Sequence, residues 1–203
     1  MYLPPQFNKP EHAHTLMHEH PLAQLISNNN EGFPFVTALP LKLDKKDPEF
    51  VLLGHCAKPN PHWKYLTQRP EALAIFTGPQ AFMSTRVYPD LVRVPTWNYL
   101  TVHAKVRARI LEGAEAKDAL LKQLIADHDA PYAAQWRSLS HDYTEKMLNG
   151  ITAFELELLD VQCKVKLNQH RPESHEAMYK AYASGNEQEK QLAQWMTRLG
   201  LYA

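Results

Sequence analysis

Two groups of side chains in this sequence could do chemistry: a histidine cluster and a basic segment. His12, His14, His18 and His20 lie within nine residues, and on a helix His14 and His18 would share one face. Zinc enzymes of the H-E-x-x-H type need a glutamate after the first histidine, whereas this chain reads H-T-L-M-H. We therefore expect a solvent-exposed first helix and no metal site.

The basic segment C-K-V-K-L-N-Q-H-R covers residues 163–171. In a strand, Lys164 and Lys166 point to the same face, and Arg171 follows them closely. Lysine and arginine bind phosphate through charge-assisted hydrogen bonds. The pattern fits both a phosphate-binding strand and an ordinary solvated strand face, and the same two interpretations apply to the K-x-R-x-R run at residues 105–109.

Several enzyme classes are excluded by missing motifs. The chain has no G-x-S-x-G segment, and the side chains of the consecutive residues 140–142 (Ser, His, Asp) diverge instead of forming a relay. His55 and Cys56 are neighbours in a predicted strand and therefore point to opposite faces. With only 7 glycines there is no glycine-rich phosphate loop, so a bound phosphate would be held by side chains. Catalytic residues stay unknown at this point.

The elements that position these residues are mostly strands. Hydrophobic periodicity predicts a helix at 11–19, a helical region at about 113–149 and two helices after about 173. It predicts a charged loop at 44–49 and strands at 22–27, 33–43, 50–56, 72–77, 81–84, 99–111 and 151–159. The strand pattern of 151–159 continues through 161–168. Many short strands without strand–helix alternation favour a barrel over a doubly wound sheet.

Composition limits the function further. The 203 residues include 22 Lys+Arg and 22 Asp+Glu, and this zero net charge argues against a broadly basic nucleic-acid-binding surface. There is no membrane-length apolar run and no readable signal peptide, and Cys56 and Cys163 lie far apart, which fits a reduced cytoplasmic protein. We expect a single domain over residues 1–203, with a helical insertion at about 113–149 and a helical tail at about 173–203.

Two further segments combine aromatic and amide side chains, a composition that suits a flat ring with polar edges. They are V-P-T-W-N-Y at 94–99 and G-H-x-A-x-x-N-P-x-W at 54–63. Together with M-Y-L-P at 1–4, H-P-L at 20–22 and the basic segment, they make the chain resemble the PaiB family of bacterial FMN-binding negative transcriptional regulators. The resemblance runs in order from residue 1 to about 171.

This resemblance implies a fold, a cofactor and a partner. The fold would be mainly β with flanking helices, an FMN-binding split β-barrel of the pyridoxamine-phosphate-oxidase and flavin-reductase type. The cofactor would be FMN, bound at the interface of a homodimer, and no membrane is involved.

The resemblance also implies which residues bind the cofactor. They are Thr37, Leu39, Pro40, His55, Ala57, Asn60, Ser84, Thr96, Trp97, Asn98, Tyr99, Lys164, Lys166, Asn168, Gln169 and Arg171. The basic residues would neutralise the phosphate, and Thr37, Leu39 and Pro40 would line the ring. The chain departs from the family pattern at Ala38, Val87, Asn168 and His170, where the family often has His, Trp, Ser and Asn.

Two other functions remain open. The protein could be a small FMN-dependent oxidoreductase or a relative of the haem-degrading split-barrel enzymes, with His55 and His103 as candidate proton-transfer groups. It could also be a binding module that has lost its flavin. Direct DNA binding lacks support from charge, because the last helix has Lys190 and Arg198 against Glu187 and Glu189.

Overall fold

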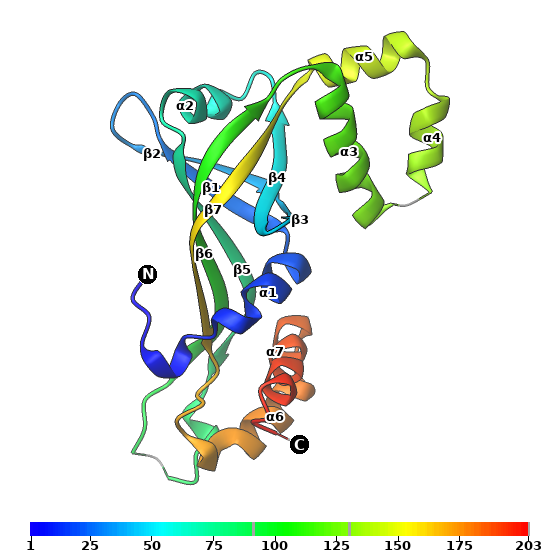
Figure 1. The fold of residues 1–203 in the computed structure, drawn as a ribbon. Coiled ribbons are helices and arrows are strands. Elements are labelled where there is room, and N and C mark those ends of the chain that lie inside the picture. The colour runs from blue at the N-terminus through cyan, green and yellow to red at the C-terminus, as the bar shows by residue number, and fades with distance from the viewer. Residues whose placement is uncertain (91, 130, 203) are drawn as a thin grey trace. The chain divides into compact units, whose positions relative to one another are not determined.

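The computed structural model describes residues 1–90, 92–129 and 131–202 (Figure 1). By their contacts, the residues form two compact units, each built from several stretches of the chain. The first unit comprises Met1–His20, Thr77–His103 and Gln162–Ala203, and the second comprises Pro21–Phe76 and Ala104–Val161. The prediction of a single domain over residues 1–203 stays a prediction.

Seven strands form one sheet within the described ranges, in the order β2-β1-β5-β6-β7-β4-β3. β1 pairs antiparallel with β2 and β5, and β4 pairs antiparallel with β3 and β7. The strands are β1 (Leu22–Asn28), β2 (Pro34–Pro40), β3 (Lys42–Lys46), β4 (Glu49–Ala57), β5 (Glu71–Met83), β6 (Thr96–Leu111) and β7 (Ile151–Lys166). This mainly antiparallel sheet with flanking helices confirms the predicted fold class.

Most helices occupy the ends of the chain and one long insertion, and α2 lies between β4 and β5 (Figure 1). The α-helices are α1 (Ala13–Glu19), α2 (His62–Gln68), α3 (Ala114–His128), α4 (Tyr132–Ser138), α5 (His141–Asn149), α6 (His175–Ala183) and α7 (Glu187–Arg198). Short 3-10 turns are η1 (Pro5–Phe7), η2 (Pro10–His12), η3 (Thr85–Val87) and η4 (Pro172–Ser174). Helices α3 to α5 fall in the region predicted as an insertion, and η4, α6 and α7 fall in the predicted tail. No helix in the described part of the chain is long and apolar enough to cross a membrane.

The prediction of one strand at 33–43 is wrong, because the chain forms two strands there. β2 ends at Pro40 and pairs with β1, whereas β3 begins at Lys42 and pairs with β4. Leu41 between them is fully buried, and its N–H donates to the carbonyl oxygen of Pro21. The sequence shows no sign of a break at Leu41, because the residues before it and the residues after it are both compatible with a strand.

The predicted loop at 44–49 is also mostly wrong, since residues 44–46 belong to β3 and pair with β4. Conversely, the two short strands at 72–77 and 81–84 are parts of the single strand β5, which continues through Gly78 and Pro79. The strand pattern predicted to begin at 151–159 and continue through 161–168 is one strand, β7, which ends at Lys166. Long strands with irregular apolar spacing look broken in a sequence, because burial changes along their length.

The cations of β6 in the second unit are paired with carboxylates. The pairs are Lys105–Asp160 at 3.4 Å, Arg107–Glu157 at 3.5 Å and Arg109–Glu155 at 2.9 Å. Lys46 of β3 also pairs with Glu155. Of the two interpretations of the 105–109 run, the solvated strand face is therefore the correct one.

Glu155 connects two of these cations, and this should make stability depend on pH. Burial opposes the charged form of Glu155, but hydrogen bonds from Lys46 and Arg109 outweigh it and hold the pKa of the carboxyl below its usual value. The carboxylate therefore stabilises the fold above about pH 4.5, and this contribution is lost as pH falls through the lower folded pKa.

We expect Glu155→Gln to lower the free energy of unfolding at pH 7 by about 1 kcal/mol, because both cations stay exposed enough to be hydrated. Urea denaturation at pH 7 and at lower pH measures both the loss and the pH dependence. The matched variant Glu31→Gln removes an exposed carboxylate and should behave like wild type. An equal pH dependence in wild type and Glu155→Gln would contradict this account.

Candidate anion-binding site

The end of β7 in the first unit carries two lysines on one face. The ammonium group of Lys166 donates a hydrogen bond to the hydroxyl of Thr96 over 2.6 Å. Lys164 is 9% exposed; it donates to the carbonyl oxygen of Tyr2 and lies 5.3 Å from the centre of the Tyr99 ring. Among the described residues, no carboxylate pairs with either lysine. Both lysines are therefore packed against neutral groups and aromatic rings.

This arrangement leaves positive charge without compensation. Burial lowers the pKa of Lys166, the electrostatic effect of Tyr99 raises it in part, and the neighbouring charge of Lys164 lowers it further. A bound anion would reverse the effect of Lys164 and favour the protonated amine. The local chemistry thus fits an anionic ligand.

The turn after β7 brings a third cation to the same place. Asn168 has a φ of 58°, in the left-handed region that asparagine tolerates better than most residues. Its amide donates to the hydroxyls of Ser174 over 2.7 Å and Tyr88 over 3.0 Å. Its backbone oxygen accepts from the N–H of Arg171 over 3.0 Å. Asn168 therefore shapes the turn that positions Arg171.

Gln169 has a similar structural role. Its side-chain oxygen accepts from the backbone N–H of Leu167 over 2.9 Å, and its amide donates to the carbonyl oxygen of Val165. Both ends of the side chain are thus committed to the backbone of β7. Gln169 and the 5% exposed Asn168 support the predicted site rather than offering free groups to a ligand.

A cleft of about 310 Å³ opens between these residues, all of them in the first unit. Four predicted site residues line it, and six others join them. The predicted residues are Thr96, Lys166, Asn168 and Arg171; the others are Gln6, Phe7, Tyr88, Arg93, Val94 and His170.

Arg93 is a site residue that the sequence analysis missed. Its guanidinium lies over the Tyr88 ring at 5.3 Å and pairs with Asp90 at 3.0 Å and with Glu173 at 3.5 Å. Its Nε atom is buried without a hydrogen-bond partner among the described residues. The available signal was a basic residue directly before V-P-T-W-N-Y, but a lone arginine in a loop is common.

The aromatic motif alternates between the two faces of β6. Trp97 is 54% exposed, and its ring meets that of Phe82 edge to face at 6.1 Å between centroids. Asn98, by contrast, has no exposed surface, and its amide donates to the Tyr182 hydroxyl over 2.8 Å. Asn98 was predicted to bind the cofactor, but in this structure it fastens α6 to β6 instead, because its side chain points into the core.

A second group of predicted residues lies in the second unit, around Thr37. The Thr37 hydroxyl is 3.2 Å from the amide nitrogen of Asn60, which donates to it, and 2.8 Å from Nδ1 of His62. The Asn60 side-chain oxygen accepts from the backbone N–H of His62 over 3.0 Å. These contacts fix Thr37 against the turn that begins α2.

His62 is a second residue that the sequence analysis missed. It is fully buried, and its Nε2 atom has no partner among the described residues. Burial lowers the pKa of His62 to about 4. One signal was available, because His62 lies inside the G-H-x-A-x-x-N-P-x-W segment at one of its variable positions.

The remaining predicted residues differ in exposure. His55 is half-buried, its Nδ1 has no partner in the described structure, and burial lowers its pKa. Ala57 and Pro40 are exposed, whereas Leu39 is 5% exposed. Ser84 is half-buried and its hydroxyl accepts from the backbone N–H of Arg86 over 3.3 Å, which starts η3. None of these side chains shows a pattern of its own that identifies a ligand.

The glycine of the G-H motif has a packing role. A Cβ atom at Gly54 would lie 2.6 Å from Leu41 Cδ2 and 3.0 Å from Phe154 Cε2. Real Cβ atoms essentially never show the shorter of these distances, and the longer one is tighter than nine in ten real Cβ contacts. Gly54 therefore lets β4 pass close to its neighbours, independently of any ligand.

Comparison with known proteins identifies the family. A family model described as "Putative FMN-binding domain" matches residues 1–160. The chain belongs to this FMN-binding family. "Protease synthase and sporulation protein PAI 2" of Bacillus subtilis (strain 168) is 33% identical over 179 residues, which cover 86% of this chain and 84% of that protein. The resemblance to the PaiB family and the prediction of FMN as cofactor are thereby confirmed.

A fungal protein and two solved structures extend the comparison. An uncharacterized protein of Emericella nidulans is 26% identical over 73% of this chain and 71% of its own length. The flavocytochrome Anf3 of Azotobacter vinelandii has a TM-score of 0.63 at 17% identity and covers 80% of this chain and 71% of its own.

The FAD and heme binding protein of Mycobacterium smegmatis has a TM-score of 0.61 at 16% identity. The match covers 78% of this chain and 71% of that protein's chain. At these identities the two solved structures are evidence on the fold alone, and they confirm the split-barrel class of the FMN-binding family.

The described residues fit the phosphate of FMN at the cleft in the first unit. Lys166 and Arg171 have no carboxylate partner among the described residues, and the buried Nε of Arg93 lacks an acceptor. Phosphate oxygens are the acceptors that such cations prefer. No metal-binding group of three or more His, Cys, Asp and Glu residues occurs in the described part of the chain.

The depressed pKa of His62 gives a prediction for stability. The fold keeps this imidazole neutral, so its contribution is present above about pH 6.5 and is lost as pH falls toward 4. We expect His62→Gln to flatten the pH dependence of the unfolding free energy between these values, as measured by urea denaturation. His18→Gln, at an exposed position, should leave the pH dependence unchanged. If His62→Gln and His18→Gln both show the wild-type dependence of the unfolding free energy on pH, burial of His62 does not have this effect on stability.

Proposed function

We propose that this protein is an FMN-binding regulator of the PaiB type, similar to the protease synthase and sporulation protein of Bacillus subtilis. The observation that carries the proposal is the cleft at the end of β7, where Lys166 and Arg171 have no carboxylate partner in the described structure. In a chain of the FMN-binding family, such a cleft is suited to the phosphate of the flavin.

Each residue of the cleft has a distinct task in this proposal. Lys166 and Arg171 donate charge-assisted hydrogen bonds to the phosphate, and Thr96 orients the Lys166 ammonium through the hydrogen bond already present. Asn168 keeps the turn in the conformation that presents Arg171. The flavin supplies a redox-active ring, whose chemistry belongs to the cofactor rather than to any side chain.

The ring contacts expected from the family remain part of the proposal. Thr37, Leu39 and Pro40 would line the ring, with His55, Ala57 and Asn60 near its polar edge. Support comes from the fixed position of Thr37, whose hydroxyl is held by Asn60 and His62. A fixed hydroxyl orients a ligand better than a mobile one, because less side-chain entropy is lost on binding.

The proposal includes a homodimer. In the first unit, Asn98 and Tyr182 show that α6 covers one face of β6, while Trp97 and Phe82 leave the other face about half exposed. The exposure of two large aromatic side chains to water is unfavourable, because their apolar surface could be buried against a partner. We propose that a second copy of the chain covers them, with FMN bound at that interface.

Direct DNA binding is not part of the proposal. In α7, Arg198 is paired with Glu19 and lies over the Trp195 ring, and the first turn of the helix carries Glu187 and Glu189. A recognition helix needs free cations or amides toward the groove. Regulation would then act through another protein, in the cytoplasm, where the buried thiols of Cys56 and Cys163 stay reduced.

The phosphate assignment is tested by titrating FMN and following the quenching of its fluorescence. We expect Lys166→Ala to weaken FMN binding by roughly tenfold to a hundredfold, because one charge-assisted hydrogen bond is lost. The melting temperature should hardly change, since Lys166 adds little to packing. Arg107→Ala removes a paired cation of β6 and is the matched control.

Three outcomes separate the functions. Unchanged FMN affinity in Lys166→Ala places the phosphate elsewhere, and no FMN binding by wild type at tens of micromolar overturns the flavin proposal altogether. Rapid bleaching of bound flavin by NADH or NADPH without oxygen would identify an oxidoreductase instead of a regulator.

The dimer proposal has its own test. We expect Trp97→Asp to shift the protein from dimer to monomer, because a charge at an apolar interface would lose its hydration. Light scattering after size-exclusion chromatography measures the mass. Tyr143→Asp, at a similarly exposed aromatic side chain of α5, is the control. A wild-type monomer at micromolar concentration, or an unchanged dimer in Trp97→Asp, contradicts the proposed interface.

A further inference from the structure

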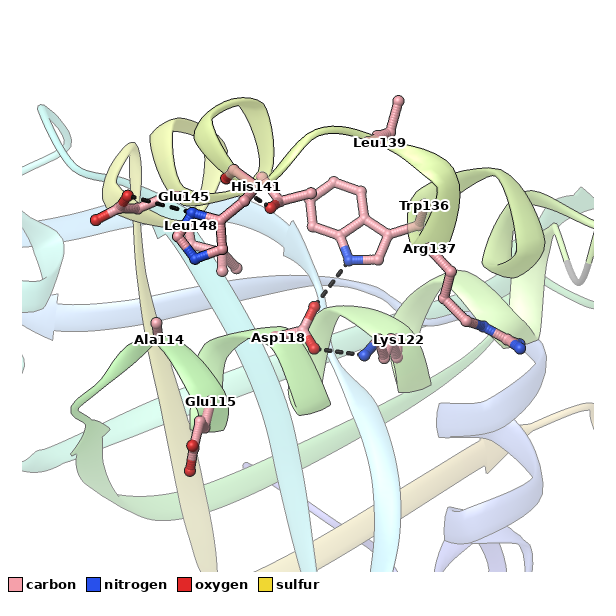
Figure 2. Close-up of a pocket in the computed structure, with 11 residues that line it drawn as sticks. Ala114, Glu115, Asp118, Lys122, Trp136, Arg137, Leu139, His141, Glu145 and Leu148 are labelled. Carbon is pink, nitrogen blue, oxygen red and sulfur yellow. Dashed lines mark hydrogen bonds and ion pairs between the residues drawn. The ribbon is translucent and has the colours of Figure 1, made fainter.

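The helical insertion of the second unit contains a cleft of about 510 Å³ (Figure 2). Among the side chains that line it, the indole N–H of Trp136 donates to one carboxylate oxygen of Asp118 over 2.8 Å. The other oxygen of Asp118 pairs with Lys122 at 2.5 Å. These three side chains satisfy one another without a ligand.

The hydrogen bonds around Thr37 of β2, in the same unit, have a different outcome. The side-chain oxygen of Asn60 accepts from the backbone N–H of His62 over 3.0 Å, which identifies this end of the amide as the oxygen. The other end is therefore the NH₂ group, and it donates to the Thr37 hydroxyl over 3.2 Å. One lone pair of the Thr37 oxygen is thus taken by Asn60.

The second contact of the Thr37 hydroxyl is with an imidazole. Nδ1 of His62 lies 2.8 Å from the hydroxyl oxygen. His62 is fully buried, and burial lowers its pKa to about 4. The ring is therefore neutral at pH 7 and carries a single N–H, either at Nδ1 or at Nε2.

Burial decides between the two ring nitrogens of His62. Nε2 is buried without a hydrogen-bond partner among the described residues. A proton at Nε2 would be a buried donor without an acceptor, which is rarer in folded proteins than an unsatisfied acceptor. The Phe35 ring, which meets the imidazole edge to face at 5.2 Å, is only a weak acceptor. The proton is therefore at Nδ1, and His62 donates it to Thr37.

Two donors then occupy the oxygen of Thr37. Because Asn60 and His62 both donate to it, its lone pairs are used, and its own proton is left for a different acceptor. Thr37 is half-buried, so part of the residue stays accessible to a ligand. Toward a ligand, Thr37 is thus a hydrogen-bond donor and not an acceptor.

We propose that His62 fixes Thr37 as the donor to a carbonyl oxygen of the flavin ring. This inference rests on the proposed function, in which Thr37 lines the ring. A carbonyl oxygen accepts hydrogen bonds and cannot donate them, so it matches a hydroxyl whose oxygen is already occupied. A ring N–H in the same place would meet a second donor and is disfavoured. His62 is a positioning residue, because it acts on the flavin only through Thr37.

Nuclear magnetic resonance tests the position of the imidazole proton. Long-range proton–nitrogen correlation at pH 7 distinguishes a ring protonated at Nδ1 from one protonated at Nε2. The full chain is measured with and without FMN, and His62→Asn identifies the His62 signals among those of the 11 histidines. We expect the proton at Nδ1 in both samples. A proton at Nε2 overturns the proposal.

Infrared spectra of bound FMN test the hydrogen bond to the ring, because a carbonyl band moves to lower frequency when its oxygen accepts a hydrogen bond. Thr37→Val should move one FMN carbonyl band to higher frequency and weaken FMN binding by about tenfold. Thr37→Ser keeps a hydroxyl and should restore both values. Thr67→Val is the control, since it removes an exposed hydroxyl of α2 that donates to the carbonyl oxygen of Trp63.

Two variants separate positioning by His62 from packing. Asparagine has an amide nitrogen on Cγ, as histidine has Nδ1, so His62→Asn keeps a donor for Thr37, whereas His62→Leu removes it. We expect the wild-type carbonyl band in His62→Asn and the shifted band in His62→Leu. A wild-type band in His62→Leu would show that His62 only fills space. If His62→Leu does not fold, the comparison of Thr37→Val with Thr37→Ser decides.

Failure of this inference differs from failure of the proposed function. FMN that binds Thr37→Val with wild-type affinity and wild-type carbonyl bands overturns the inference and leaves the flavin proposal intact. The absence of FMN binding by wild type is the result that overturns the flavin proposal, and the inference is overturned with it.

Discussion

The first unit is organised around uncompensated positive charge at the end of β7. Lys166 donates to Thr96, Lys164 lies against the Tyr99 ring, and the turn formed by Asn168 adds Arg171. Bringing like charges together without a counter-ion is unfavourable. Burial lowers the pKa of Lys166, and the neighbouring charge of Lys164 lowers it further. Such an arrangement is suited to an anionic ligand. The support around it, from Tyr88 through Ser174 and Gln169, is neutral and fully committed to hydrogen bonds.

The same alternating pattern of cations has a different outcome on β6. Arg107 and Arg109 look like Lys164 and Lys166 in sequence, yet each meets a carboxylate on β7 in the second unit. An anion offered to β6 would have to displace these carboxylates, whereas at the end of β7 the cations Lys166 and Arg171 have no carboxylate partner in the described part of the chain. Zero net charge in the whole chain therefore conceals one neutral strand face and one cationic cleft.

Three of the residues predicted to bind the cofactor have side chains that contact other protein groups. Asn98, Asn168 and Gln169 have side chains that are buried or bonded to the backbone, so they shape the places where Trp97, Lys166 and Arg171 are presented. The two residues that the sequence analysis missed, Arg93 and His62, lie next to predicted motifs and differ from surface residues only in their surroundings. The residue type shows which hydrogen bonds a side chain can donate or accept. It does not show which neighbour in the fold is the partner of those hydrogen bonds.

The sequence by itself determined the class of fold and the family. Alternation along 99–111 and the apolar stripe of α7 depend on local geometry, which a sequence expresses directly. Only the tertiary structure decided that 33–43 divides between two sheet neighbours, that β5 is continuous, and that one basic run is paired with carboxylates while Lys164 and Lys166 have no carboxylate partner among the described residues. The physical reason is the same in each case: strand pairing and ion pairing join residues far apart in the chain, and their free energy depends on neighbours that only the fold supplies.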